Sequence, residues 1–203
     1  VGAATSGQIK SSCGVALDVV GNVYIADTGN HRIRFIPKTS GTYFGQSRTA
    51  NYIYTIAGTG GATYSGDGGA ATSGGIQSPG KVCVDAAGNV YIADTANHRI
   101  RFVPKTSGTY FGQTRTANYI YTIAGDGTGS YGGDGGAAGS GQLYSPSGVS
   151  VDDQGNVIIG DYENHRIRFV PKKSGTYFGQ SMTANSLYTI AGDGTGTYGG
   201  DGE

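Results

Sequence analysis

Residues 88–101 read Gly-Asn-Val-Tyr-Ile-Ala-Asp-Thr-Ala-Asn-His-Arg-Ile-Arg, and this stretch decides the fold. Its first half is a β-rich run that follows a glycine, and its second half is a turn followed by alternating arginine and isoleucine. Nearly the same residues stand at 21–34, and a diverged version stands at 155–168. Both steps are 67 residues long, so the chain is built from an internal repeat.

The repeat accounts for the whole chain and divides it into three units, at approximately 1–67, 68–134 and 135–203. Aligning 14–60 with 81–127 gives 38 identical positions out of 47. The units therefore diverged recently, or they were made alike by design.

The two ends of the sequence are in phase with each other. Residues 2–7 match the internal segment 69–74, and the last residues, 201–203, stand where the same motif begins again. We therefore expect the chain to join head to tail, either to itself or to a second copy.

Each unit carries four β-strand signals, which are short apolar or β-branched runs separated by turn residues. In the second unit they lie at 81–85, 89–94, 99–103 and 119–124. Alternation in the third run places Ile100 and Phe102 on one face and Arg99 and Arg101 on the other. Helix signals are nearly absent, and the best candidate is a short turn near 69–74.

The composition agrees with many short strands joined by turns. Glycine makes up 39 of the 203 residues, with only five prolines and no Gly-X-Y period, which excludes a collagen-like chain. Glycine supplies the positive φ angles that tight turns need.

Charge, hydropathy and cysteine content argue against a nucleic-acid partner, a membrane helix, and a disulfide or metal site. The 14 basic and 14 acidic residues balance, so the chain lacks the field of a protein that binds a phosphate backbone, and we expect no nucleic-acid partner. No apolar run reaches the ~20 residues of a membrane helix, and residues 1–4 lack the features of a signal peptide. The compartment is not indicated, and an extracellular bacterial parent is compatible with the sequence. Cys13 and Cys83 occupy non-equivalent places in the repeat, which argues against a disulfide or a metal site.

The pattern Gly-Asn-Val-Tyr-Ile-Ala-Asp-Thr-x-Asn-His-Arg-Ile-Arg resembles the NHL-repeat signature. The third unit departs from it at Ile158, Gly160, Tyr162 and Glu163. The resemblance implies an all-β fold of β-propeller blades, each with four antiparallel strands, packed around an axis. The units exceed the ~40–45 residues of a typical propeller repeat. The excess lies in two predicted loops, one that starts at 104–113 and one at 125–147.

Three blades do not close a propeller ring, because such rings contain about 4–8 blades. An open stack leaves the apolar faces of its first and last blades exposed. The resemblance favours six blades, so we predict a head-to-tail homodimer in which blade three of each chain meets blade one of the other. A trimer with nine blades is the second possibility. Residues 1–13 are expected to reach onto the last blade of the partner.

The Asp-Thr-x-Asn-His-Arg turn is assigned a structural role. Aspartate and asparagine stabilise tight turns by accepting hydrogen bonds from nearby backbone N–H groups. The arginine that follows is expected to bridge the aspartate or the carbonyls of a neighbouring blade. The residues concerned are Asp27, Asn30, Arg32, Asp94, Asn97, Arg99, Asp161, Asn164 and Arg166.

Two sets of side chains are candidates for a ligand surface. One is the histidine of each turn, for which metal binding is the alternative to a structural role. The other is an aromatic pair in the first long loop, which serves either as a contact platform or as a plug on its own blade. These residues are His31, His98, His165, Tyr43, Phe44, Tyr110, Phe111, Tyr177 and Phe178.

The glycine-aspartate loops at 126–135 and 193–202 superficially resemble calcium-binding loops. Within 126–135, Asp126 and Asp134 are the only carboxylates, too few for an ion that takes six to eight oxygens, and we predict no metal site. The simpler interpretation is a glycine turn in which Tyr64, Tyr131 and Tyr198 pack back onto the blade.

The sequence therefore predicts a non-enzymatic propeller scaffold or interaction module that assembles with itself, without catalytic residues or a cofactor. It is either an excerpt from a longer repeat protein or a designed fragment. One alternative, taken from related propellers, is a metal-dependent lyase or hydrolase. A second is an RNA- or carbohydrate-binding NHL-type module.

Overall fold

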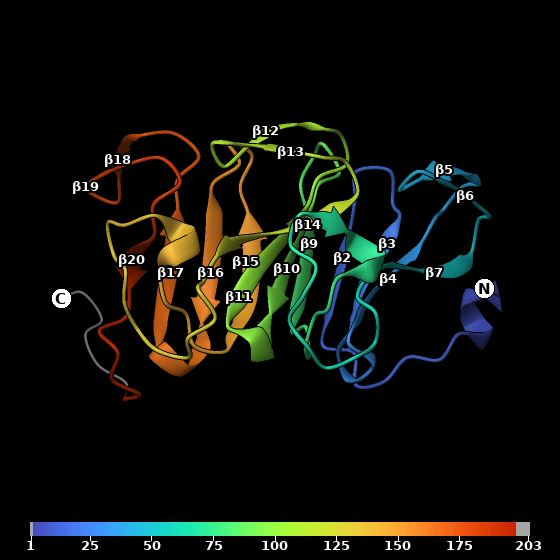
Figure 1. The fold of residues 1–203 in the computed structure, drawn as a ribbon, viewed down its shortest axis with the longest axis horizontal. Helices are drawn as coiled ribbons and strands as arrows, with labels where there is room; N and C mark the ends of the chain where they lie inside the picture. The colour runs from blue at the N-terminus through green and yellow to red at the C-terminus, as the bar shows by residue number, and fades with distance from the viewer. Residues whose placement is uncertain (1, 198–203) are drawn as a thin grey trace.

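The structure is a computed structural model that describes residues 2–197, and it consists of three antiparallel sheets standing side by side in a row (Figure 1). The first sheet has the strand order β1-β7-β4-β3-β2. Its strands are β1 (Gly2–Ala3), β2 (Gly14–Leu17), β3 (Val23–Asp27), β4 (Arg32–Ile36) and β7 (Tyr52–Ala57).

The second and third sheets repeat this plan. The second has the order β8-β14-β11-β10-β9, and the third has the order β15-β16-β17-β20. The second contains β8 (Gly69–Ala70), β9 (Lys81–Val84), β10 (Val90–Asp94), β11 (Arg99–Val103) and β14 (Tyr119–Ala124). The third contains β15 (Pro146–Val151), β16 (Val157–Asp161), β17 (Arg166–Val170) and β20 (Tyr188–Ala191).

All four strand signals of the second unit are confirmed, and their bounds shift by one residue at most. The predicted alternation in β11 also holds, because Ile100 and Phe102 lie in an apolar cluster while Arg101 lies against aspartates. The innermost strands β2, β9 and β15 neighbour one another, as blades around an axis require.

The first long loop of each unit contains strands that the sequence analysis did not predict. It contains a two-stranded hairpin, and the three hairpins lie along one edge of the row (Figure 1). At the turn of the second hairpin both Phe111 and Gly112 have positive φ, the conformation of a type I′ turn. Phenylalanine rarely adopts that conformation, so the sequence did not signal the turn. The strands are β5 (Gly41–Tyr43), β6 (Gln46–Arg48), β12 (Gly108–Tyr110), β13 (Gln113–Arg115), β18 (Gly175–Tyr177) and β19 (Gln180–Met182).

Helical structure between residues 2 and 197 is limited to single 3-10 turns. The turn predicted near 69–74 is present as η3, and an equivalent turn precedes each of the other sheets. The remaining three turns follow β3, β10 and β16 and carry the Asp-Thr-x-Asn positions of the repeat, with Tyr162 in place of threonine in the third. The turns are η1 (Ala4–Ser6), η2 (Thr28–Asn30), η3 (Ala71–Ser73), η4 (Thr95–Asn97), η5 (Ala138–Ser140) and η6 (Tyr162–Asn164).

The amino-terminal segment corrects part of an expectation. Residues 1–13 were expected to reach onto a partner, yet Gly2 and Ala3 pair with Ile53 and Tyr52 of the chain's own first sheet. The reason is visible in the next unit, where β8 pairs with β14 of the sheet that follows it. Such a short strand therefore belongs to the following blade. Residue 1 lies outside the described residues.

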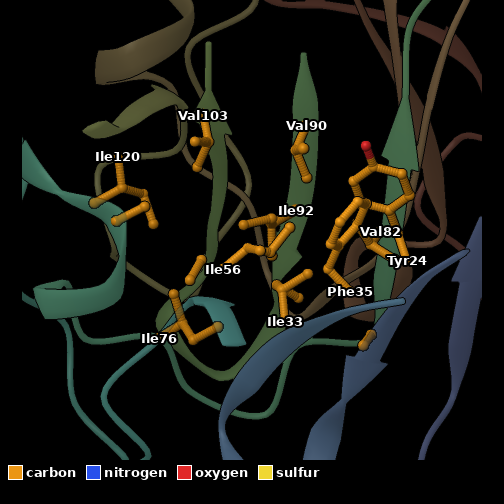
Figure 2. Close-up of a cluster of buried hydrophobic side chains, with 13 residues drawn as sticks. Tyr24, Ile33, Phe35, Ile56, Ile76, Val82, Val90, Ile92, Val103 and Ile120 are labelled. Atoms are coloured by element: carbon orange, nitrogen blue, oxygen red, sulfur yellow. The ribbon is translucent and has the colours of Figure 1, made fainter. Parts of the chain in front are cut away.

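Apolar side chains from facing sheets fill the space between them. Figure 2 shows the first of these clusters, in which Ile33 and Phe35 of β4 point toward Val90 and Ile92 of β10. A matching cluster joins the second and third sheets and includes Ile100 of β11 and Ile159 of β16. The protein is thus an all-β stack of three β-propeller blades, each holding its neighbour through an apolar face.

Truncation of Ile92 tests this core, because the side chain is fully buried between the first two blades. We expect Ile92→Ala to lower the free energy of unfolding by about 2–5 kcal/mol and Ile92→Val by about 0.5–1.5 kcal/mol. Urea denaturation of both variants measures the difference. Equal losses for the two variants would contradict a close-packed contact at this site.

Candidate functional site

The second strand of each blade ends in an aspartate, and an asparagine follows three residues later in the turn. Hydrogen bonds to this aspartate fix the turn and the segment that precedes the blade. Asp94 is fully buried, and its carboxylate accepts hydrogen bonds from the Gln77 backbone N–H at 2.7 Å and from Asn97 Nδ2 at 2.9 Å. Burial raises the pKa of the Asp94 carboxyl, while these hydrogen bonds and the charge of Arg101 act in the opposite direction. Asp27 and Asp161 occupy the same place in the other two blades.

The first arginine after the turn was expected to bridge this aspartate or the carbonyls of a neighbouring blade, and it does neither, because its acceptors lie in its own unit. Arg99 donates instead to the carbonyls of Asn97 and Asp126, and Arg101 binds the aspartate, with 3.2 Å between Nη1 and Oδ2 of Asp94. Arg101 is fully buried whereas Arg99 is half-buried, so only the deeper side chain reaches the buried carboxylate. Arg34 and Arg168 make the same ion pair with Asp27 and Asp161, whereas Arg32 and Arg166 donate to carbonyls as Arg99 does.

A short segment from one unit binds the arginines of the next blade, and we call it the latch segment (64–67 and 131–134). In the first of these, Asp67 pairs with Arg101 Nη2 at 2.6 Å and accepts the Thr122 backbone N–H at 3.0 Å. The ring of Tyr64 lies under Arg99, with 3.7 Å from Cζ to the ring centroid. The latch segment therefore ties two blades together through charge, hydrogen bonds and a cation–π contact.

The second latch segment repeats this geometry in the third blade. Asp134 binds Arg168 and accepts the Thr189 backbone N–H at 3.1 Å, and Tyr131 lies under Arg166 at 3.8 Å. These tyrosines were expected to pack back onto the blade, and they pack on the following blade instead. Each segment runs along the outer strand of the next sheet, so that blade is the surface within reach. Tyr198 lies outside the described residues.

The histidines of the turns also join successive blades. His31 Nδ1 accepts the backbone N–H of Ser78 at 3.0 Å, and His98 Nδ1 accepts that of Ser145 at 3.0 Å. His165 stands at the same position in the last blade, and it has positive φ like the other two. Each of the first two imidazoles faces the next blade, and the histidines are not brought together.

The aromatic pairs pack on their own blades. The Phe44 ring lies 5.3 Å from Phe35 and 6.4 Å from Tyr24 between centroids, and Tyr43 lies 5.2 Å from Phe35. Phe111 and Tyr110 repeat these contacts on Phe102, and Phe178 and Tyr177 repeat them on Phe169. The third pair differs in one respect, since Phe178 is largely exposed.

The aspartates of the glycine loops are engaged by the protein itself. Asp126 Oδ1 accepts the Thr128 backbone N–H at 2.7 Å, and Asp134 is held by Arg168. Within residues 2–197, no three side chains among His, Cys, Asp and Glu gather as metal ligands would. The part of 193–202 from residue 198 on is not described. In the same described range, no helix has the length and apolar character to cross a membrane.

The Gly-Asn of the repeat motif has a function in folding that the sequence reasoning missed. Asn89 is buried and donates to Asp85 from both its backbone N–H and its side chain, while its Oδ1 accepts the Lys105 backbone N–H at 2.9 Å. It thereby fastens the first hairpin of the blade to the end of β11. The signal was the spacing of Asp85 and Asn89, which recurs in all three units.

One cavity of about 520 Å³ opens on the outer side of the first blade. Arg34, Arg48, Tyr54 and Thr55 line it, and they occupy the same repeat positions as Arg101, Arg115, Tyr121 and Thr122 around the first latch segment. No latch segment precedes this blade among residues 2–197. The cavity therefore leaves exposed a surface of the first blade whose counterpart on the second blade is covered by a latch segment.

Stacked four-stranded blades with an inner strand at the axis define the class of protein as a β-propeller module. The family model described as NHL repeat matches residues 77–101 and 143–168. The predicted resemblance is thereby confirmed, and the chain carries NHL repeats at these two places.

Solved structures support the fold. A structural genomics protein of unknown function from Bacteroides thetaiotaomicron is 18% identical with a TM-score of 0.55, and the match covers 91% of this chain and 36% of that one. An auxiliary nutrient binding protein from the same organism is 14% identical with a TM-score of 0.52, over 92% and 37%. Another from Bacteroides ovatus is 13% identical with a TM-score of 0.52, over 91% and 37%. The chain thus spans just over a third of their length. No curated protein matches significantly.

Replacing Arg101 tests the buried ion pair. Arg101→Met leaves the buried Asp94 without its cation, so we expect a loss of about 3–5 kcal/mol in the free energy of unfolding. The double variant Arg101→Met with Asp94→Asn has no fully buried lone carboxylate, since the Asp67 side chain is 37% exposed, and should recover part of this loss. Arg99→Met is the matched control, since that guanidinium is half-buried and bears no buried partner charge. Chemical denaturation that ranks Arg99→Met as equally harmful would contradict the assignment.

The two cysteines should differ in reactivity. Cys13 is exposed, whereas burial raises the pKa of the Cys83 thiol to about 12. The thiolate is the reactive form, so at pH 8 a soluble thiol reagent should modify Cys13 rapidly and Cys83 only after unfolding. Mass spectrometry of labelled peptides with and without urea measures this. Rapid labelling of Cys83 in the native protein would show that this innermost strand is more accessible than the structure indicates.

Proposed function

We propose that the chain is an assembly module, without catalytic chemistry of its own, that completes a propeller ring by joining a second copy head to tail. Three blades per chain then give six blades per ring, within the range of closed propellers. The proposal is supported by the way the two end blades differ from the blade between them.

The observation that carries the proposal lies on the innermost strand of the first blade. Val15 is 61% exposed, whereas the same repeat position in the next two blades is 0% exposed at Val82 and 5% at Val149. Val82 belongs to the apolar cluster between the first and second blades. Val15 is therefore part of an exposed apolar face, and the equivalent faces of the second and third blades are covered by the blade before them.

The opposite end of the stack shows the complementary exposure. Ile167 on β17 is 38% exposed, whereas its counterparts Ile33 and Ile100 are fully buried against the following blade. Phe178 and Tyr162 are also largely exposed there. Ile167 occupies the position of Ile33, which packs in the same cluster as Val82 of the next blade. Val15 occupies the position of Val82, so the face with Ile167 is complementary to the face with Val15.

The ionisable groups favour an assembly role over chemistry. The buried aspartates are bound by arginines, and two of the three histidines accept a backbone N–H of the next blade. A catalytic acid, base or nucleophile needs to face a cleft with its reactive atom free. The side chains that sequence analysis proposed for ligand contact, other than His165 and Phe178, are instead used between blades or within them.

The mass of the protein in solution tests the proposal. We expect a dimer by sedimentation velocity at micromolar concentration, and we expect Val15→Asp to convert it to a monomer, because a charge cannot be buried unpaired at the junction. Val19→Asp is the matched control. Val19 is exposed at a turn, and its counterpart in the third blade is Asp153.

A monomer at all concentrations would overturn the proposal, as would a dimer that Val15→Asp leaves unchanged. A particle of three chains would support head-to-tail joining and replace six blades by nine. Loss of the dimer in Val19→Asp would point to a general effect of charge rather than to the apolar face.

A further inference from the structure

We propose that the cavity on the first blade binds the latch segment 198–201 of a second copy. This inference rests on the proposed function and adds to it the peptide that the site recognises. The cavity is lined by Arg34, Arg48 and Thr55. The residues at the positions of Arg34 and Thr55 in the other two blades bind a latch segment, and they are Arg101, Thr122, Arg168 and Thr189.

The sequence supplies a third latch segment. Residues 64–67 read Tyr-Ser-Gly-Asp, 131–134 read Tyr-Gly-Gly-Asp, and 198–201 again read Tyr-Gly-Gly-Asp, each 67 residues after the one before. Two of the three segments bind the blade that follows them. Within residues 1–203, no blade follows the third segment and no latch segment comes before the first blade.

Arg34 of the first blade makes one of the two aspartate contacts that its counterparts make. Its Nη1 donates to Asp27 at 3.1 Å, as Arg101 does to Asp94, but its Nη2 finds no hydrogen-bond partner among the described residues. Arg101 Nη2 binds Asp67, and Arg168 Nη2 binds Asp134. The side chain of Arg34 is 16% exposed where both counterparts are 0% exposed. An aspartate from outside would complete it.

The first blade also has the residues that make the other contacts of a latch segment in the second blade. Arg99 and Arg101 hold the Tyr64 ring, and their counterparts on the first blade are Arg32 and Arg34. The Thr55 backbone N–H corresponds to that of Thr122, which donates to Asp67. Charge favours the match, since the cavity carries two arginines and no carboxylate among its lining residues.

Close backbone packing makes the recognition specific. A Cβ on Gly66 would lie 2.6 Å from Cα of Gly74, and one on Gly133 would lie 2.6 Å from Cα of Gly141. Both Gly66 and Gly133 have positive φ. The third pair is Gly200 with Gly7, so a larger residue at 200 would be excluded from the cavity.

In the proposed ring, the occupant comes from the second copy. The first blade and the last blade stand at opposite ends of the row, with β7 at one end and β20 at the other (Figure 1). Residues 192–197, which follow β20, therefore lie at the end of the stack away from the first blade (Figure 1). In a head-to-tail ring the last blade of one copy is next to the first blade of the other, which brings 198–201 to the cavity.

The test compares dimer affinity among variants of the full chain. We expect Asp201→Asn and Gly200→Val each to raise the dimer dissociation constant by about a hundred-fold, which is roughly ten-fold at each of the two junctions. Glu203→Gln removes a carboxylate outside the latch segment and should leave the constant unchanged. Sedimentation equilibrium gives the constants, and circular dichroism shows whether each variant remains folded.

A second measurement does not depend on variants. A synthetic peptide spanning residues 193–203 should compete with the dimer and shift it toward monomer, whereas the same peptide with Gly200→Val should not. A dimer whose affinity is unchanged by Asp201→Asn, Gly200→Val and the peptide would overturn the latch inference and leave the proposed function standing. A parent chain that never dimerises would overturn both.

Discussion

The structure depends on one constraint, which is that each blade has two apolar faces and no means of covering them alone. Ile33 of the first blade is fully buried in the cluster that it shares with Val82 and Ile92 of the next blade. Its counterpart Ile167, which no described blade follows, is 38% exposed. Burial of apolar side chains stabilises by about 1.5–3 kcal/mol for each large residue, so a covered face is worth far more than any single polar contact. The stack is consequently held blade by blade, as in other repeat proteins.

Polar contacts decide how the blades align. Apolar packing is non-directional, whereas the buried Arg101 has to satisfy Asp94 of its own blade and Asp67 of the preceding unit at once. The histidine that accepts a backbone N–H of the next blade adds a second fixed point. Together these contacts select one orientation of each blade from the many that the apolar faces alone would permit.

Because the units are nearly identical, the exposure of a residue can be compared with that of the equivalent residue in the other two units. Differences in exposure between equivalent positions arise from the place of a blade in the row and not from the residue that occupies it. Val15 and Val82 are the same residue in the same strand, and only the presence of a preceding blade distinguishes them. Apolar side chains at the two ends of the row are therefore exposed where their counterparts within it are buried.

The sequence by itself determined the period, the four strands of each blade and the Asp-Asn turns, because all of these follow from local alternation and turn chemistry. Only the tertiary structure decided which arginine is buried and which blade the Tyr-Gly-Gly-Asp segments bind. Arg101 and Asp67 are 34 residues apart, and their contact depends on how one blade sits on the next. The Phe-Gly turns likewise escaped prediction, since packing of Phe111 on Phe102 offsets a backbone conformation that local preference disfavours.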